Sequence, residues 1–327
     1  MRPLDIYFVA IGGTGMAPLA CLLQELGHHV RGADGPLYPP MSDLLAAAGI
    51  EPLVGWDPDH LESTTGGRTP DVVIVGNAVP RHNPEAEATE CLGLERLSMP
   101  QALARFFLAS RRPLVIAGTH GKTTTTAMAA WVWSQCGADP GYLIGGAPQN
   151  FDRSFHIGGG PRFIIEGDEY NAAYFDRGPK FLHYRPQTLI LTSVEHDHAD
   201  LYPDPEALLD AYRKLVALLP PDGLLVACGD GAEVREVAVG AACPVIFYGL
   251  GETNDVHPAA LDGGFEITLS MPGEHNLSNA LAVWAAARHD GLPAPAVAAA
   301  LAGFRGVRRR LENLGEARGV TVIDDFA

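Results

Sequence analysis

Short apolar segments alternate with longer amphipathic or alanine-rich segments along most of the chain. Runs such as 6–11, 72–75 and 188–192 are rich in Val, Ile and Leu, which is typical of buried strands. Stretches such as 17–26 and 123–135 have the length and apolar spacing of helices. Strands that alternate with helices over short connections predict an α/β fold with a mostly parallel sheet.

The alternation starts again after Arg111-Arg112-Pro113, so we predict a boundary there, with domains at 1–110 and 111–318. The second domain is expected to hold strands at 114–117, 163–165, 188–192, 224–227 and 245–248, an edge or antiparallel strand within 261–270, and helices at 276–289 and 294–302.

A glycine-rich turn follows the first strand and opens the first predicted helix. Gly13 and Gly15 supply the G-x-G of a dinucleotide fingerprint, but Pro18 occupies the third glycine position. Such a turn brings the backbone close to a diphosphate at a helix N-terminus. We therefore predict a diphosphate site, with a purely structural turn as the alternative. Asp34 ends the second strand, where an acid that binds ribose is expected.

A second glycine turn, 118–124 (GTHGKTT), follows the strand at 114–117 and opens the helix at 123–135. Backbone amides of such a loop wrap phosphates, a lysine reaches the β- and γ-phosphates, and a hydroxyl binds Mg²⁺. Lys122 and Thr123 occupy those positions. Ile116 stands where the standard P-loop has its first glycine, so the loop is a shortened variant. The pattern predicts ATP and Mg²⁺ as cofactors.

Composition excludes several classes of protein. The formal charge is −16, from 23 basic and 39 acidic residues, so a nucleic-acid binder is not expected. No apolar run approaches the roughly 18 residues of a membrane span, and the N-terminus lacks a secretory pattern. Five widely spaced cysteines without C-x-x-C indicate a reducing cytoplasm rather than a disulfide framework or a zinc site.

The motifs together resemble the Mur ligases, which make bacterial peptidoglycan precursors. The second glycine turn resembles their ATP loop, and the first resembles the uridine-diphosphate loop of the muramate-binding branch. Further stretches that resemble motifs of that branch, in the same order, are 166–170 (EGDEY), 195–200 (EHDHAD), 273–279 (GEHNLSN), 309–312 (RRLE) and 324–327 (DDFA). The resemblance implies a Rossmann-like UDP-binding domain followed by a P-loop ATPase-type domain.

On the ATP side, the resemblance implies roles for particular residues. The groups expected to act in catalysis are Lys122, Glu166, His198 and Arg310. Those expected to hold Mg²⁺ are Thr123, Glu166 and His198. Those expected to bind the nucleotide are Gly118, Thr119, His120, Gly121, Lys122, Thr123, Thr124, Asn276, Asn279, Arg310 and Asp325.

Ordinary structural roles remain open for four of these positions. Glu166 is alternatively a solvated acid after a strand, and Asn276 a helix cap. His198 is alternatively a loop histidine, since Mg²⁺ prefers oxygen ligands. The run 308–310 is alternatively a solvated basic face, and it does not by itself identify which arginine meets phosphate.

On the UDP side, the resemblance implies that the diphosphate meets Gly13, Thr14, Gly15 and Met16. Asp34 is then expected at the uridine side, with Ser42 and Asn77 in the same cleft.

Details such as YPPMS (38–42) and EGDEY (166–170) favour the tripeptide-adding members of the family. The implied reaction is the ATP-dependent joining of L-Ala-γ-D-Glu-meso-diaminopimelate to UDP-N-acetylmuramate through an acyl phosphate, in peptidoglycan recycling. An alanine-adding ligase is the rival enzyme. An unrelated P-loop ATPase with an accessory α/β domain is a third interpretation.

The chain stops at 324–327, directly after an apolar strand at 320–323. From the resemblance, 319–327 is expected to begin a hinge to a further, carboxyl-terminal domain that carries the amine. The chain is then a fragment, and a nucleotide- and UDP-sugar-binding module without ligase activity is a further alternative. The oligomeric state is not predicted.

Overall fold

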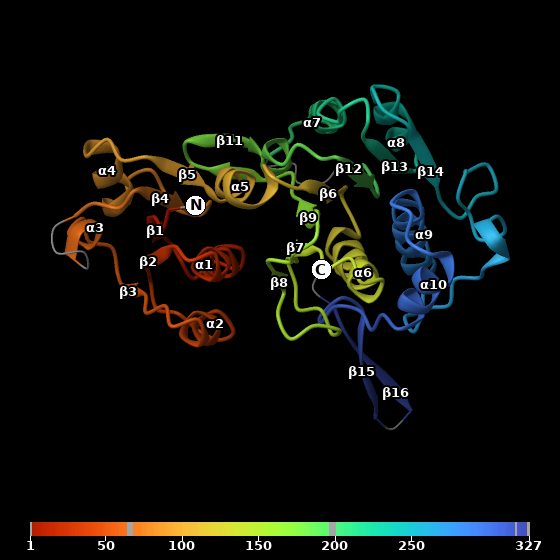
Figure 1. Cartoon of the computed structure of the whole chain (residues 1–327), viewed down its shortest axis with the longest axis horizontal. Coiled ribbons are helices and arrows are strands. Elements are labelled where there is room, and N and C mark those ends of the chain that lie inside the picture. The colour runs from red at the N-terminus through yellow and green to blue at the C-terminus, as the bar shows by residue number, and fades with distance from the viewer. Residues whose placement is uncertain (1, 64–67, 196–200, 318, 326–327) are drawn as a thin grey trace. The chain divides into compact units, whose positions relative to one another are not determined.

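The computed structural model describes residues 2–63, 68–195, 201–317 and 319–325. It forms two compact units, Met1–Ser110 with Glu169–Tyr184, and Arg111–Asp168 with Arg185–Ala327. Both units are α/β, which confirms the predicted fold class (Figure 1). Among the residues described, none of the helices has the length and apolar content needed to cross a lipid bilayer.

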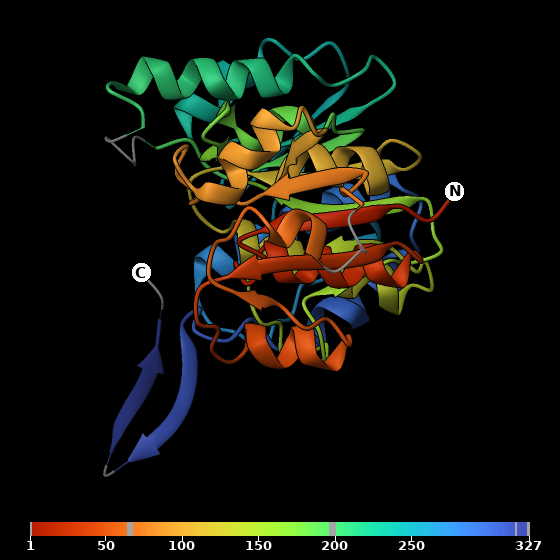
Figure 2. The same ribbon diagram turned by 90° about the vertical axis from the view of Figure 1, so that its left-hand side faces the viewer.

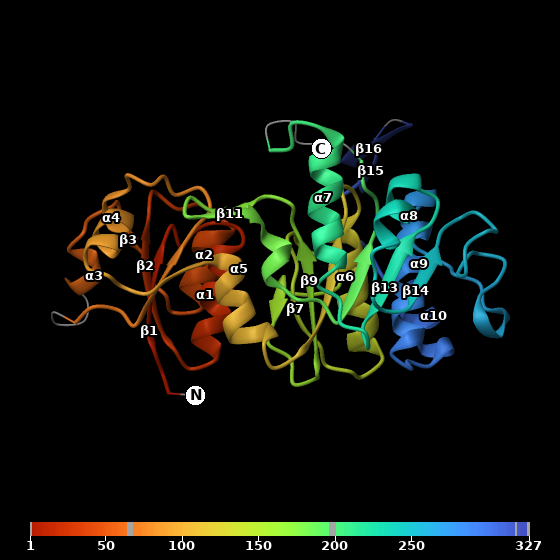
Figure 3. The same cartoon turned by 90° about the horizontal axis from the view of Figure 1, so that it is seen from above.

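The first unit is built on a parallel sheet of order β3-β2-β1-β4-β5. Helices α1 and α2 lie on one side of this sheet, and α3 and α4 lie on the other (Figure 3). Because both faces are covered, β1 and β4 are apolar along nearly their whole length. The elements are β1 (Asp5–Val9), α1 (Met16–Glu25), β2 (His29–Asp34), α2 (Met41–Ala47), β3 (Leu53–Val54), α3 (His60–Ser63), β4 (Val72–Val75), α4 (Pro84–Cys91), β5 (Arg96–Ser98), α5 (Met99–Leu103) and the π-helix η1 (Ala104–Leu108).

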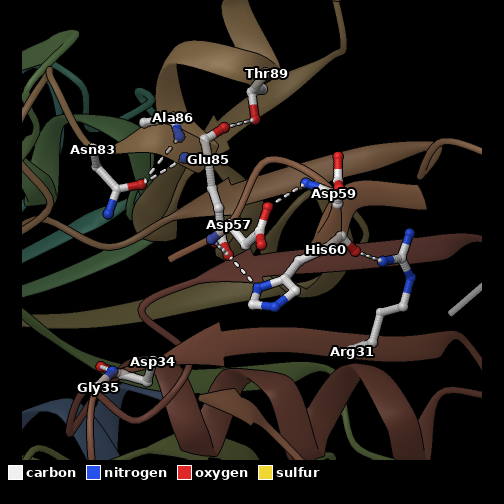
Figure 4. A network of polar contacts seen from close by, with 10 residues as sticks. All are labelled: Arg31, Asp34, Gly35, Asp57, Asp59, His60, Asn83, Glu85, Ala86 and Thr89. Carbon is white, nitrogen blue, oxygen red and sulfur yellow. Dashed lines mark hydrogen bonds and ion pairs between the residues drawn. The ribbon is translucent and has the colours of Figure 1, made fainter. Parts of the chain in front are cut away.

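A buried polar network crosses one face of this sheet, and the sequence pattern did not indicate it (Figure 4). Glu85 is fully buried in the first turn of α4, and its Oε1 lies 2.8 Å from Nδ1 of His60. Burial raises the pKa of the Glu85 carboxyl and of the Tyr7 hydroxyl. Arg31 donates to the carbonyls of His60 and Leu61, each at 2.8 Å. The network ties the α3 segment to the sheet.

The segment Glu169–Tyr184 packs with the first unit, although it falls within the range 111–318 predicted as the second domain. It contains β10 (Asn171–Ala173), β11 (Asp176–Pro179) and the 3-10 helix η2 (Lys180–His183). The Ser98 hydroxyl and Asp176 Oδ2 are 2.6 Å apart, and the Tyr174 hydroxyl donates to Glu90 at 3.0 Å. These contacts attach the segment to residues near β5.

The second unit contains a seven-stranded sheet of order β14-β13-β12-β6-β9-β7-β8, parallel except for the β7–β8 pair. Helices α7 and α8 cover one face, and α6, α9 and α10 cover the other (Figure 1). The elements are β6 (Arg112–Ala117), α6 (Lys122–Gln135), β7 (Gly141–Leu143), β8 (Phe155–His156), β9 (Arg162–Gly167), β12 (Thr188–Leu191), α7 (Pro205–Val216), β13 (Leu224–Cys228), α8 (Ala232–Ala238), β14 (Val245–Tyr248), the 3-10 helix η3 (Asp262–Gly264), α9 (Glu274–His289) and α10 (Ala294–Ala302).

The strand predicted within 261–270 is wrong. After η3, residues 265–269 have no regular structure. Phe265 packs against the ring of Trp284 at 5.9 Å, and Ile267 and Leu269 also lie against the core. The alternation therefore records packing on helices rather than strand pairing. Beyond α10, β15 (Glu312–Ala317) and β16 (Val320–Asp324) form an antiparallel hairpin that projects from its unit (Figure 2).

Candidate functional site

The second glycine turn joins β6 to α6, and two of its positions accept only glycine. Gly121 caps α6 with φ +79°, and Gly118 has φ +133°. A Cβ on Gly121 would lie 2.8 Å from Oδ1 of Asn279, and one on Gly118 would lie 2.2 Å from the Thr192 hydroxyl. The turn is therefore pressed against both α9 and the residues after β12.

Residues after β12 support this turn from behind. The N–H groups of Thr119 and His120 donate to the Ser193 carbonyl and hydroxyl, each at 3.0 Å. The Thr192 hydroxyl donates to the His120 carbonyl at 2.6 Å. Those two amides are therefore occupied by contacts inside the protein. The N–H groups in the first turn of α6 have no side-chain cap, so they are the groups that could bind an anion. Thr124 lies in this turn.

Lys122 folds back over its own loop. Its Nζ donates to the carbonyls of Gly118 and Thr119, at 2.6 and 3.2 Å. The ammonium group therefore lies at the mouth of the turn, where a phosphate chain would bring anionic oxygens.

Glu166 lies at the carboxyl end of β9 and faces the glycine turn. Its Oε2 accepts a 2.8 Å hydrogen bond from the Thr123 hydroxyl, and its Oε1 accepts one from the Gly145 N–H. Burial raises the pKa of Glu166 to about 7, with a further contribution from the nearby Asp168 carboxylate. The structure thus joins two predicted metal ligands from separate motifs.

The oxygens of Glu166 and Thr123 are hard donors of the kind that Mg²⁺ prefers, so they fit the predicted ion. No cluster of three or more His, Cys, Asp and Glu side chains suited to a metal occurs in the described part of the chain. His198, the third predicted ligand, lies outside the described residues.

Asn276 and Asn279 lie at the start of α9 and are both buried. Asn276 Nδ2 donates to the Pro272 carbonyl at 2.7 Å, so it closes the turn before the helix rather than capping it. Asn279 faces Gly121. Asn279 therefore borders the second glycine turn, and both asparagines lie at the start of α9, in the segment predicted to meet adenine.

The basic run 308–310 follows α10 and is exposed. Arg309 has φ +58°, and its Nε lies 3.8 Å from Asp324 in β16. The predicted ribose ligand Asp325 accepts from the Leu311 N–H at 3.0 Å. These contacts hold the run to the base of the hairpin.

In the first unit, Asp34 shapes the glycine turn. Its Oδ2 accepts from the Gly12 N–H and its Oδ1 from the Gly35 N–H, both at 2.7 Å. Sequence reasoning passed over Gly12, yet a Cβ there would lie 2.0 Å from Leu37 Cδ2. Because both carboxylate oxygens are used by backbone amides, Asp34 has a structural role in the turn.

The other residues predicted for UDP lie near the carboxyl ends of β1, β2 and β4. Gly13 and Thr14 lie in the turn, Gly15 is the N-cap of α1, and Met16 is the first helical residue. Ser42, in the first turn of α2, donates to Asp43 at 3.3 Å. The Asn77 amide donates to the Asn171 carbonyl at 3.3 Å. Parallel sheets bind ligands at this edge.

The comparisons with known proteins agree with the motifs. Residues 5–111 match the Mur ligase family, catalytic domain, and residues 116–287 match the Mur ligase middle domain. The chain is 43% identical over 336 residues to the Escherichia coli UDP-N-acetylmuramate--L-alanyl-gamma-D-glutamyl-meso-2,6-diaminoheptandioate ligase, with 99% of this chain and 72% of that protein covered.

Two further relatives represent the tripeptide-adding and the alanine-adding ligases. The Neisseria meningitides structure of UDP-N-acetylmuramate:L-alanyl-gamma-D-glutamyl-meso-diaminopimelate ligase superposes with a TM-score of 0.86 and 37% identity, over 94% of this chain and all of that one. The Paenarthrobacter aurescens UDP-N-acetylmuramate--L-alanine ligase is 36% identical, with 98% of this chain and 70% of that protein covered. The chain belongs to the Mur ligase family.

Proposed function

We propose that the protein is an ATP-dependent ligase that joins the tripeptide L-Ala-γ-D-Glu-meso-diaminopimelate to UDP-N-acetylmuramate. The observation that carries the proposal is the 2.8 Å contact between Thr123 and Glu166 at the head of the glycine turn. This contact brings a carboxylate and a hydroxyl together beside the glycine turn, and an ATP-dependent ligase needs such oxygens to hold a metal ion at the γ-phosphate. The choice of tripeptide rests on the identity of 43% to the Escherichia coli tripeptide ligase, against 36% and 39% to two alanine ligases.

The proposed reaction has two steps. The lactyl carboxylate of UDP-N-acetylmuramate attacks the γ-phosphorus of ATP, which gives an acyl phosphate and ADP. The tripeptide amine then attacks the acyl carbon, and the amide forms as phosphate leaves and the amine loses a proton. Two anions meet in the first step, so catalysis depends on positioning and on charge compensation.

On the ATP side, Lys122 and Arg310 bind the phosphates. Glu166 and Thr123 hold Mg²⁺, which neutralises charge on the phosphate oxygens when bound, and His198 is proposed as a further ligand. Gly118, Thr119, His120, Gly121 and Thr124 shape the loop. Asn276 and Asn279 contact adenine, and Asp325 contacts the ribose.

In the first unit, Gly13, Thr14, Gly15 and Met16 bind the diphosphate of UDP-N-acetylmuramate, with Ser42 and Asn77 beside them. Asp34 holds the turn and lies at the uridine side. We further propose 1–110 and 111–318 as the UDP-sugar and ATP domains, 319–327 as a hinge, and a cytoplasmic location.

The amine specificity tests the proposal. The full-length protein is incubated with ATP, Mg²⁺ and UDP-N-acetylmuramate, and phosphate release and amide product are compared for the tripeptide and for alanine. Product with the tripeptide is expected. Product with alanine alone would make the protein an alanine-adding ligase. Binding of both nucleotides with no amide product would make it a binding module.

A further inference from the structure

The loop 145–150, which follows β7, begins at the proposed metal site. The Gly145 N–H donates to Oε1 of Glu166, and a Cβ on Gly145 would lie 2.0 Å from that oxygen. A Cβ on Gly146 would lie 3.0 Å from Thr123 Cγ2 and 2.8 Å from Val307 Cγ1. The backbone at the start of the loop is therefore in close contact with the Thr123–Glu166 pair.

The other end of the loop pairs with the segment 303–308. The Arg308 N–H donates to the Ala147 carbonyl, and the Gln149 N–H donates to the Gly306 carbonyl, both at 2.9 Å. Pro148 and Val307 form an antiparallel bridge between these bonds. A short two-stranded connection thus runs from the metal carboxylate to the start of the arginine run.

The side chain of Asn150 closes this connection at its far end. Its Oδ1 accepts from the Arg305 N–H at 2.7 Å, and its Nδ2 donates to the Gly303 carbonyl at 2.9 Å. A carboxamide offers an acceptor and a donor at once, which a carboxylate or an alkyl group of the same size does not. Asn150 therefore fixes the segment by two backbone contacts of opposite polarity.

The arginine run needs such support from outside itself. Gly306, Arg309 and Leu311 all have positive φ values, +94°, +58° and +48°. For residues other than glycine this backbone conformation is unfavourable, and it persists where surrounding contacts hold it. The contacts of Asn150 and of the loop supply that support directly before residue 308.

We propose that Asn150 is a positioning residue for the terminal phosphate of ATP, acting through the loop that it clamps. On the proposed function, Asn150 keeps Arg308–Arg310 at the correct position relative to Glu166. Both groups then act on the γ-phosphate, which ADP lacks. An error of about 1 Å between such groups is costly for catalysis.

The experiment compares nucleotides that differ in this phosphate. Dissociation constants for the ATP analogue adenylyl imidodiphosphate and for ADP, each with Mg²⁺, are measured by calorimetry for the wild type, Asn150→Ala, Asn150→Asp and Asp152→Asn. Asn150→Ala removes both side-chain contacts and is expected to weaken analogue binding about tenfold and ADP binding less than about twofold. Asn150→Asp retains the contact with Arg305 and is expected to lose about threefold.

Asp152, exposed just beyond this loop, is the matched control, and Asp152→Asn is expected to bind both nucleotides as the wild type does. Equal weakening of both nucleotides by Asn150→Ala and Asn150→Asp would show a merely structural role and overturn the inference, as would no weakening. If Asn150→Ala binds no ADP, the ratio of the two dissociation constants is taken from Asn150→Asp instead. A wild-type protein that binds neither nucleotide would instead overturn the proposed function.

Discussion

The hydroxyl of Thr123 donates a 2.8 Å hydrogen bond to Oε2 of Glu166, joining positions 43 residues apart in the chain. Thr123 is fixed by the first turn of α6, and Glu166 by the end of β9, a direct neighbour of β6. The pairing of β6 with β9 is therefore what brings the two oxygens together. Sites built on helices and strands are held more precisely than sites built on loops.

Replacing Glu166 by Gln tests its proposed role as a metal ligand. Glutamine is a poorer Mg²⁺ ligand because it lacks the charge, so Glu166→Gln is expected to lower the rate of amide formation about 100-fold or more. ADP binding in the absence of Mg²⁺ is expected to persist. The rates are measured over a range of Mg²⁺ concentrations. Glu233→Gln, at an exposed position in α8, is the control, and equal rates for both variants would contradict the assignment.

The stability of the metal-free protein is expected to depend on pH through Glu166. In the folded protein burial raises its pKa to about 7, whereas an unfolded chain ionises it near the ordinary value of about 4.3. Between these values the folded state binds more protons, so this contribution to the free energy of unfolding falls as pH rises.

Glu166→Gln removes this titration. In the presence of a chelator, the difference in Tm (variant minus wild type) is expected to be roughly 2–4 °C larger at pH 8 than at pH 5. The measurement is thermal unfolding in matched buffers at several pH values. Parallel curves for the two proteins would contradict the raised pKa.

A pair of glycines at the two ends of α6 separates backbone strain from steric contact. Gly121 and Gly137 have φ values of +79° and +76°. A Cβ on Gly121 would lie 2.8 Å from Asn279 Oδ1, whereas one on Gly137 has nothing within 4 Å. Gly121→Ala is therefore expected to weaken ADP binding at least about tenfold, and Gly137→Ala to cost only about 1 kcal/mol of stability. Calorimetry and thermal unfolding supply both numbers, and similar ADP affinities would refute the prediction.

Asp34 is expected to matter for the first unit as a whole. Asp34→Ala leaves the N–H groups of Gly12 and Gly35 without their acceptors, at an expected cost of about 1–2 kcal/mol in the free energy of unfolding. Affinity for UDP is expected to fall with the loss of the turn. Asp43→Asn, at an exposed carboxylate in α2, is expected to stay within about 0.5 kcal/mol of the wild type. Urea unfolding measures the stability of both variants. An Asp34→Ala variant as stable as the wild type would show that Asp34 does not hold the turn.

Features that depend on local residue pattern were predictable from the sequence. The run Val72–Val75 is buried throughout, as expected of a central parallel strand. Glycines in the second turn adopt positive φ values that few other residues tolerate. In both cases the residues that carry the signal are adjacent in the chain, so one sequence suffices to read it.

Features that depend on distant partners were not predictable in this way. The anchoring of Asp176 by Ser98 joins positions 78 residues apart, and no local pattern indicates it. Glu85 has the sequence surroundings of an ordinary acid in a first helical turn, yet it is fully buried beside His60. The two amide contacts that occupy Asp34 likewise depend on how the turn closes in three dimensions.

The segment Glu169–Tyr184 has a consequence for any attempt to divide the protein. Because it leaves the second unit after Asp168 and returns at Arg185, the polypeptide passes between the units three times, the first at Ser110–Arg111. A protease that cuts only at Ser110 would leave the fragment 1–110 held to residues 169–184 by non-covalent contacts. A gene fragment that encodes residues 1–110 would lack the partners of Ser98 and Glu90, so the first unit can be isolated with these contacts only if residues 169–184 are grafted onto it.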